Sequence, residues 1–223
     1  MTSPDPESRP EQDNTRLRLL EAAEEVFAEK GYEAATVRDI CERAGVKNIG
    51  AVNYYFQGKD RLYAEAVKFA LRTCASGAPF PEWPADTSPE QKLRDFIRIM
   101  MTRLIAAPKA ASMRLWTREL TEPTAACAEA VQENIRPLAE MLRSVLAELM
   151  PKATDEERWL TGFSVVGQCL FYRMNRAVAA VLMGPESFGR LTVDAIADHI
   201  ADFTLAALKP VGSRQSAVGS DRF

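Results

Sequence analysis

Residues 36–59 have the sequence TVRDICERAGVKNIGAVNYYFQGK, and the fold that we expect follows from this stretch. It predicts a helix that begins after Thr36, a tight turn at Gly45, a short helix over about Ile49–Tyr55 and a further helix from near Lys59. Two short helices joined in this way form a helix-turn-helix, whose second helix fits the major groove of DNA. The stretch therefore predicts a DNA-binding unit near the N-terminus. The helix formers Ala, Leu, Glu and Arg dominate the chain and strand-like alternation is absent, which predicts an all-α protein.

Short-range signals support these boundaries. The Thr36 hydroxyl can accept a backbone N–H at the start of its helix, and the carboxylate of Asp39 favours the positive end of that helix. Gly45 tolerates the left-handed backbone that closes a helix. Val46 is expected to fill the gap between the two short helices.

Helices are also predicted on both sides of this stretch. An apolar stripe at helical spacing indicates a helix over about Thr15–Lys30, which Gly31 ends. A second stripe indicates a helix from Lys59 to about Ser76. The inward residues are Leu19, Leu20, Ala23, Val26 and Phe27 in the first helix, and Leu62, Tyr63, Ala66, Val67, Ala70 and Leu71 in the second.

Prolines divide the chain into the regions that we expect. Residues 1–13 are predicted to be a disordered tail, and residues 14–76 a three-helix helix-turn-helix domain. A proline cluster marks residues 77–88 as a linker, because proline lacks an N–H and clashes with the preceding turn. Residues 89–209 are predicted to form a second helical domain, and residues 210–223 a loose tail.

The predicted C-terminal domain consists of helices separated by prolines. Pro137 lies inside one of them and is expected to kink it. The predicted helices cover about Pro89–Ala106, Ala111–Leu120, Thr124–Met150, Asp155–Met183 and Thr192–Lys209.

The composition excludes several classes of protein. Hydrophobic residues make up 47% and charged residues 26% of the 223 residues, which is typical of a globular protein. No segment has about eighteen consecutive apolar residues, and the N-terminus is polar and acidic, so we expect neither a membrane span nor a signal peptide. The protein is expected in the cytoplasm. The 4 cysteines and 1 histidine are scattered, so no metal site or cofactor is expected.

The charge distribution favours a nucleic-acid partner more than the net charge does. The formal net charge is −3, and residues 1–13 carry one arginine against four acids. Residues 36–61 contain five basic and three acidic residues. The predicted DNA-binding segment is therefore locally positive, although the whole chain is acidic.

Side chains around the predicted second short helix have the chemistry of DNA recognition. Asparagine amides suit adenine edges, and small residues permit close approach to the duplex. Tyrosine hydroxyls suit phosphates, and Lys59 adds its charge to free N–H groups at a helix start. Thr36 and Arg38 could hold the opposite backbone. The candidate DNA contacts are Thr36, Arg38, Lys47, Asn48, Ile49, Gly50, Asn53, Tyr54, Tyr55 and Lys59.

Some of these residues have a simpler explanation. Lys47 is equally well explained as a solvated charge in the turn, and Thr36 as a helix cap alone. At least one of Tyr54 and Tyr55 is expected to face DNA. Phe56 and Tyr63 fit the core better than a contact with DNA.

Residues 21–67, EAAEEVFAEKGYEAATVRDICERAGVKNIGAVNYYFQGKDRLYAEAV, resemble the N-terminal domain of the TetR/AcrR family of transcriptional regulators. The resemblance covers about Arg16–Leu71. Its motifs appear in order: Phe-x-x-x-Gly-Tyr, a Thr cap, an Ala-Gly-Val turn, Tyr-Tyr-Phe and Gly-Lys-x-x-Leu-Tyr. Most members have one residue fewer between the turn glycine and the aromatic pair. The longer form over Lys47–Tyr54 resembles the CecR-like branch. Because of this extra residue, the sequence does not decide between two neighbouring positions for each base contact.

The resemblance implies a homodimer that presents two helix-turn-helix units to a palindromic operator. The family dimerises through its last two long helices, here about Asp155–Met183 and Thr192–Lys209. The first is apolar over much of its circumference, and Gly162 and Gly167 would permit close approach of a partner helix. A central buried helix within one subunit is the alternative. The apolar residues are Phe163, Val165, Val166, Leu170, Phe171 and Met174.

The resemblance also implies a small-molecule effector that binds within the C-terminal helices. Residues 167–177, GQCLFYRMNRA, resemble the C-terminal domain of the CecR-like branch. Arg173 and Arg176 are expected on one helix face, where they could pair with an anionic ligand or with acids of the other subunit. Aromatic residues at helical spacing fit a packed core as well as a pocket. The candidate ligand contacts are Trp116, Phe163, Gln168, Tyr172, Arg173 and Arg176.

Two other classes of protein remain as alternatives. An enzyme is disfavoured, because the chain has no Gly-x-Ser-x-Gly, no Gly-rich phosphate loop and no His-Glu-x-x-His. A helical interaction module or scaffold without an effector is the other alternative, and the polar third helix argues against it. The sequence thus predicts a ligand-responsive DNA-binding regulator, with repression as the family's commoner mode. Its predicted partners are double-stranded DNA, a small-molecule effector and a second copy of the chain.

Overall fold

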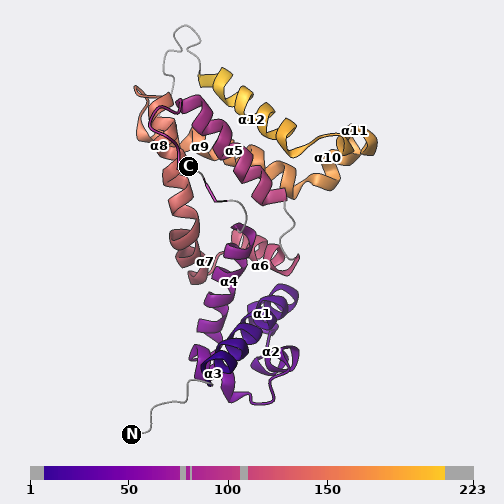
Figure 1. The fold of residues 1–223 in the computed structure, drawn as a ribbon. Helices are drawn as coiled ribbons and strands as arrows, with labels where there is room; N and C mark the ends of the chain where they lie inside the picture. The colour runs from indigo at the N-terminus through magenta and orange to yellow at the C-terminus, as the bar shows by residue number, and fades with distance from the viewer. Residues whose placement is uncertain (1–7, 76–78, 81, 106–109, 209–223) are drawn as a thin grey trace, which may run out of the picture. The chain divides into compact units, whose positions relative to one another are not determined.

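The computed structural model describes residues 8–75, 79–80, 82–105 and 110–208, and these residues form helices and connections without a β-strand (Figure 1). Contacts divide the chain into two compact units. The first contains residues 1–78 and 102–141, and the second contains residues 79–101 and 142–223. The all-helical fold predicted from the sequence is confirmed.

The first unit is built around the N-terminal helices. Gly31 has a positive φ of 77° inside α1, so the predicted glycine break is present, although helical residues continue to Ala34. The helix also begins at Ser8, within the stretch expected to be a tail; Pro10 is tolerated in the first turn, where no N–H is needed. The elements are α1 (Ser8–Ala34), α2 (Val37–Ala44), α3 (Gly50–Phe56), α4 (Lys59–Ala75), α6 (Ala110–Thr121), α7 (Ala125–Ala130) and the π turn η1 (Val131–Ile135).

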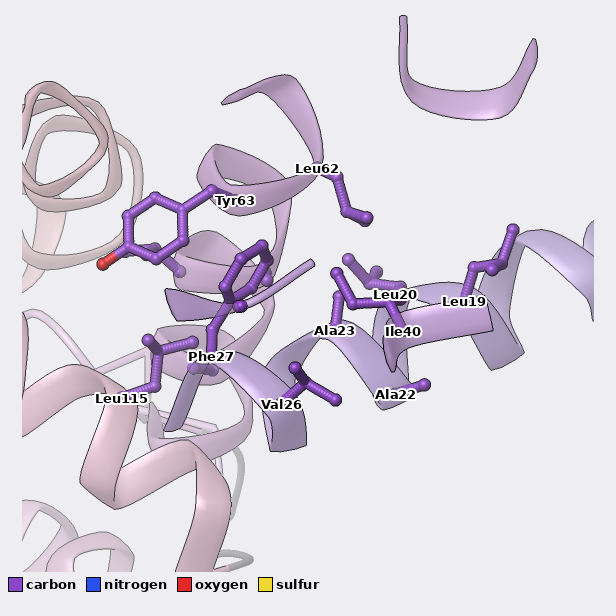
Figure 2. Close-up of a cluster of buried hydrophobic side chains, with 14 of the residues drawn as sticks. Leu19, Leu20, Ala22, Ala23, Val26, Phe27, Ile40, Leu62, Tyr63 and Leu115 are labelled. Carbon is purple, nitrogen blue, oxygen red and sulfur yellow. The ribbon is translucent and has the colours of Figure 1, made fainter. Parts of the chain in front are cut away.

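Both predicted apolar stripes of the first unit are buried, as expected. Figure 2 shows Leu19, Leu20, Ala23, Val26 and Phe27 of α1 in this cluster. The Phe27 and Tyr63 rings meet edge to face with centroids 4.8 Å apart, and Leu115 of α6 belongs to the same cluster. Helix α6 therefore packs with the N-terminal helices rather than in a separate C-terminal core.

The helix expected over Thr124–Met150 is continuous but irregular. It consists of α7, η1 and α8 (Arg136–Leu149), and the Arg136 N–H bonds to the Val131 carbonyl, five residues back. Pro137 has no N–H to donate to the carbonyl four residues earlier, and its ring would clash with that carbonyl. A widened π turn just before the proline accommodates both effects.

The second unit contains most of the C-terminal helices. The helix expected over Asp155–Met183 is in fact two helices, because Asn175 leaves the helical region with φ −109° and ψ 21°. Asparagine side chains bond readily to nearby backbone groups, so they favour helix ends. The unit's elements are α5 (Pro89–Ile105) up to residue 101, α8 from residue 142, α9 (Asp155–Met174), α10 (Arg176–Met183), α11 (Pro185–Gly189) and α12 (Val193–Leu208).

Ion pairs join the helices of the second unit around its apolar core. Arg98 of α5 pairs with Asp198 of α12 at 2.8 Å, and Lys92 pairs with Glu148 of α8 at 2.8 Å. The fully buried residues beneath them include Leu93, Ile97, Leu146, Val165, Cys169 and Ile200.

The expected domains at residues 14–76 and 89–209 stay predictions. The two compact units divide the chain at other places, within α5 and within α8. The described residues between α4 and α5 are not helical, as expected of a linker. Residues 1–7 and the predicted tail 210–223 lie outside the described part. None of the described helices is long and apolar enough to cross a membrane.

Candidate nucleic-acid interface

Helix α2 begins at a complete capping box. The Thr36 hydroxyl accepts the Asp39 N–H at 3.1 Å, and the Asp39 carboxylate accepts the Thr36 N–H at 3.0 Å. Lys30 of α1 lies 2.9 Å from the same carboxylate. The bond from Lys30, followed by those from Thr36, lowers the pKa of Asp39 to about 2. The predicted cap is therefore confirmed, and it also joins α2 to α1.

The turn between α2 and α3 is as tight as predicted. Gly45 has a left-handed backbone with φ 66°, and its N–H bonds back to the Glu42 carbonyl at 3.1 Å. Val46 donates to the Cys41 carbonyl at 2.8 Å and packs half-buried against the core, which confirms its predicted role as a filler. These bonds close the end of α2 and direct the chain into α3.

Helix α3 has an apolar inner face and a polar outer face. Ala51, Val52 and Phe56 are buried, which confirms that Phe56 belongs to the core. Asn53 is exposed, and Tyr54 is 71% exposed. Helix α3 therefore presents Asn53 and Tyr54 outward, whose side chains can make hydrogen bonds, as a helix entering the major groove requires.

The two asparagines differ in what their amides can still do. The Asn48 Oδ1 accepts the Gly50 N–H at 2.9 Å, so Asn48 stabilises the start of α3. Reading adenine requires both the oxygen and the nitrogen of one amide. The Asn53 side chain does not bond to the backbone at the start of α3, so Asn53 is the better-placed candidate for a base contact.

The tyrosine pair is divided between surface and core. Tyr54 projects into solvent, and Tyr55 is half-buried against the core cluster. Their rings meet edge to face with centroids 4.8 Å apart, so the Tyr54 ring packs against the Tyr55 ring. Tyr63 is buried and its hydroxyl donates to Glu119 at 2.5 Å, which confirms that it is a core residue.

The predicted phosphate contacts surround this outer face. Thr36, Arg38 and Lys47 are exposed. Lys59 is half-buried at the start of α4, with its ammonium 4.4 Å from the centre of the Tyr32 ring and 3.5 Å from the Glu33 carbonyl. A phosphate contact by Lys59 would compete with these two contacts. Ile49 and Gly50 are exposed as well, and every candidate residue lies on α2, its cap, α3, the turn or the start of α4.

The candidate effector residues are not gathered in one place. Trp116 is buried in the core of the first unit, whereas the other five belong to the second unit. Phe163 is 62% exposed, and Gln168 and Tyr172 are half-buried on α9. The expectation for Arg173 and Arg176 is wrong: Asn175 separates α9 from α10 between them, and Arg176 lies over the Phe188 ring at 5.6 Å.

None of the six candidates lines either of two cavities in the described part of the chain. One of about 620 Å³ in the second unit is lined by apolar residues that include Leu149 and Leu205, and by the Arg94–Asp202 ion pair. The other, of about 470 Å³ in the first unit, lies beside Tyr32, Tyr63 and Lys68. The structure thus provides space for a small molecule at positions that the sequence did not indicate.

One contact of the helix-turn-helix was missed entirely. Arg18 of α1 donates to the carbonyls of Ala44 and Gly45, at the end of α2. The partners are 26 and 27 residues apart in sequence. No local pattern predicts such a bond, because the charge of Arg18 equally fits a solvated helix face.

Two family models match the chain. Residues 89–208 match the C-terminal domain of the HTH-type transcriptional dual regulator CecR, which is more than half of the chain. Residues 19–66 match the bacterial regulatory proteins of the tetR family. The second match contains every candidate residue of the helix-turn-helix.

Individual relatives agree with the family models. The transcriptional repressor AcnR of Corynebacterium efficiens is 46% identical over 50 residues, which are 22% of this chain and 26% of AcnR. This chain therefore matches about a quarter of that relative's length. The dual regulator CecR of Shigella flexneri is 27% identical over 187 residues, which are 79% of this chain and 83% of CecR.

Solved structures show the same fold. The TetR family transcriptional regulator PfmR from Thermus thermophilus has a TM-score of 0.57 to this structure at 20% identity. The match covers 85% of this chain and 97% of that one. At this identity the likeness concerns the fold alone.

Proposed function

Because the chain belongs to the TetR family of bacterial regulatory proteins, with a C-terminal domain of the CecR type, we propose that this DNA-binding transcriptional regulator represses its targets by binding a palindromic operator as a homodimer. A small-molecule effector releases it from the operator. The matched proteins are transcriptional regulators, so the chain is a regulator and not an enzyme.

The observation that carries the operator proposal is the two-sided character of α3. Ala51, Val52 and Phe56 hold the helix on its core, which leaves Asn53 and Tyr54 free to enter a groove. A rigid inner face fixes the direction of the outer side chains, and base recognition depends on that direction. Exposed basic residues at either end of the helix-turn-helix can hold the phosphates.

A continuous apolar stripe on α9 supports the homodimer. Leu160, Phe163, Phe171 and Met174 are exposed, and they recur with Gly167 at spacings of three and four residues along one helix face. Helix α12 packs against α9 and exposes Phe203, at 60%, and His199. Exposed apolar stripes on two packed helices favour a symmetric four-helix contact with a second copy.

The two glycines of α9 differ, and the expectation that Gly162 would permit close approach of a partner helix is wrong. A Cβ at Gly162 would lie 3.6 Å from Leu142, so Gly162 faces the unit's own core. A Cβ at Gly167 would meet nothing within 4 Å, and Gly167 lies in the middle of the exposed stripe. A helix of a second subunit can therefore approach closely at Gly167 without displacing any part of the subunit to which Gly167 belongs.

Repression and effector release rest on the relatives and on the available space. AcnR is named a repressor, and CecR a dual regulator, so repression is proposed as the mode with more support. The 620 Å³ cavity of the second unit falls in the size range of small-molecule sites. Half-buried Gln168, Tyr172 and Arg173 stay candidates for contacts with the effector.

Selection of bound fragments from random DNA tests the operator proposal. The expected product is an inverted repeat whose half-site centres lie about 10 base pairs, or a multiple, apart. The mass of the complex should correspond to at least two protein chains per operator. A single asymmetric site bound by one chain would contradict the proposal, and so would the absence of any enriched sequence, which the interaction-module alternative predicts.

The two asparagines give a matched pair of variants. Asn53→Ala should relax the preference at one base pair per half-site, at a cost of roughly 1–3 kcal/mol. Asn48→Ala removes the bond that stabilises the start of α3, at a cost of about 1 kcal/mol, so it should weaken operator binding without changing the preference at any single base pair. Repeating the selection with both variants shows which asparagine reads a base. Retention of the full consensus by Asn53→Ala would contradict its assignment.

A ligand screen tests effector release. Compounds that raise the melting temperature should also release operator DNA, because a ligand of the released state must bind that state more tightly than the DNA-bound state. A Leu205→Trp variant, which narrows the 620 Å³ cavity, should respond to higher ligand concentrations only. A broad screen in which no compound affects both melting and DNA release would count against the effector.

A further inference from the structure

The end of α2 receives hydrogen bonds from a distant side chain. Arg18 lies on α1, and its Nη2 donates to the Ala44 carbonyl and, at 3.2 Å, to the Gly45 carbonyl. The last carbonyls of a helix have no partner within the helix. A guanidinium at this position satisfies two of them and places a positive charge at the negative end of the helix.

The other side of the turn is also held by side chains. The Cys41 thiol lies 3.9 Å from the Asn48 carbonyl, and the Asn48 Oδ1 accepts the Gly50 N–H at 2.9 Å. Arg18 therefore holds the part of the turn that leaves α2, while Cys41 and Asn48 hold the part that enters α3. Residues 45–49, which connect the two helices, are fixed at both ends.

Helix α3 depends on this turn for its orientation. It has seven residues, and its buried side chains are Ala51, Val52 and Phe56, the first two of which are small. So short a helix with so small a buried face can tilt on the core unless the preceding turn is rigid. Hydrogen bonds to bases tolerate little change in angle or distance, whereas attraction to phosphates tolerates more.

We propose that Arg18 is a positioning residue for sequence recognition: it fixes the turn before α3 and so determines the selectivity for operator over other DNA, without contacting DNA itself. The inference rests on the proposed operator binding. It assigns a role to a residue of α1 that lies outside the helix-turn-helix and whose guanidinium is occupied by backbone carbonyls.

Arg18→Met tests this role, because methionine removes the donors and keeps an unbranched stem. Operator and non-operator DNA of equal length are titrated at several salt concentrations. We expect operator affinity to fall about tenfold and non-operator affinity to change less than about twofold, with the same salt slope as the wild type. Arg18→Lys keeps one charged donor group and should restore part of the selectivity.

Arg72→Met is the control for the lost charge, since Arg72 is exposed near the end of α4. It should leave the ratio of operator to non-operator affinity unchanged. Circular dichroism at the titration temperature verifies that each variant is folded. A smaller folded fraction lowers both affinities equally, so it cannot imitate a loss of selectivity. If Arg18→Met is poorly folded, Arg18→Lys carries the same prediction with a smaller change.

Three results would overturn the inference. An unchanged affinity ratio in Arg18→Met means that the turn does not need Arg18. An equal loss on both DNAs means that Arg18 contributes only to folding. A salt slope lower by about one means that Arg18 contacts a phosphate. Failure of the wild type to select any operator would instead contradict the proposed function, before any variant is compared.

Discussion

Helices α3 and α9 each bury one face, but their outer faces have opposite chemistry. The outer face of α3 presents Asn53 and Tyr54, and the exposed residues next to it are mostly polar or basic. The outer face of α9 presents Phe163, Phe171 and Met174. Most of the large apolar side chains exposed in the described residues lie, like these, in the second unit.

The difference indicates two kinds of partner. Nucleic acid offers phosphates and base edges, so a surface for DNA needs donors, acceptors and positive charge. A second protein chain offers apolar area, whose removal from water drives association. The same secondary structure can therefore serve either partner, and the outward residues decide which one.

The largest expected effect comes from placing a charge in the apolar stripe. Phe163→Glu would bury an unpaired carboxylate twice in a symmetric dimer, at a cost of several kcal/mol for each. We expect the dimer dissociation constant to rise at least about 100-fold and operator binding to weaken with it. Light scattering after size-exclusion chromatography measures the oligomeric state.

Leu120→Glu is the matched control, since Leu120 is 48% exposed on α6 of the first unit. It should leave the dimer intact. A protein that stays dimeric with Phe163→Glu, or that dissociates equally with Leu120→Glu, would show that the stripe on α9 is not the contact between subunits.

Gly167→Ala should have opposite effects on the monomer and on the dimer. Alanine is the better helix former, and its Cβ meets nothing within 4 Å in the subunit, so we expect the monomer to gain about 0.5–1 kcal/mol. The same methyl group would obstruct a closely packed partner helix, so the dimer dissociation constant should rise about tenfold. Urea unfolding in the Phe163→Glu background isolates the monomer, and sedimentation velocity over a dilution series measures association. A tighter dimer would contradict close approach at Gly167.

A smaller effect is expected on the polar side. Lys59→Ala should lower the affinities for operator and non-operator DNA by a similar factor. It should also lower the slope of log affinity against log salt concentration by about one, because one phosphate contact is lost. Lys152→Ala is the control, since Lys152 is exposed in the second unit. Fluorescence anisotropy at several salt concentrations gives both slopes. An unaltered slope would mean that Lys59 remains on Tyr32 in the complex.

The smallest effect concerns pH. The bonds from Lys30 and Thr36 lower the pKa of Asp39 from 3.8 to about 2, so its carboxylate stabilises the start of α2 above about pH 4. That stabilisation is lost as the pH falls through about 2. NMR titration of the carboxyl carbon should show this midpoint, and Asp39→Asn should remove this pH dependence of α2. A midpoint near 3.8 would indicate that the capping box is open in solution.

Local signals were sufficient for most of the helix-turn-helix. Thr36 and Asp39 marked a helix start, and Gly45 marked its end, because caps and left-handed turns depend on a few adjacent residues. The apolar stripes of α1 and α4 identified the core for the same reason. The second short helix was displaced by only one residue, from Ile49–Tyr55 to Gly50–Phe56.

Other features depended on contacts between distant residues. Asn175 ends α9 without a proline or glycine beside it, so the sequence suggested one helix where there are two. Trp116 was expected in an effector pocket, but α6 carries it into the core of the first unit. Arg18 and the two carbonyls that it binds are brought together only when α1 packs on α2.

The sequence by itself determined the helical fold, the position of the DNA-binding unit and the residues of its outer face, because these follow from hydrophobic spacing and helix caps over a few residues. Only the tertiary structure decided which of those residues pack against other helices, as Tyr55 and Lys59 illustrate, and which distant side chain holds the turn. The contacts of Arg18 with α2 and of Lys59 with Tyr32 join segments far apart in the chain, so no local pattern encodes them.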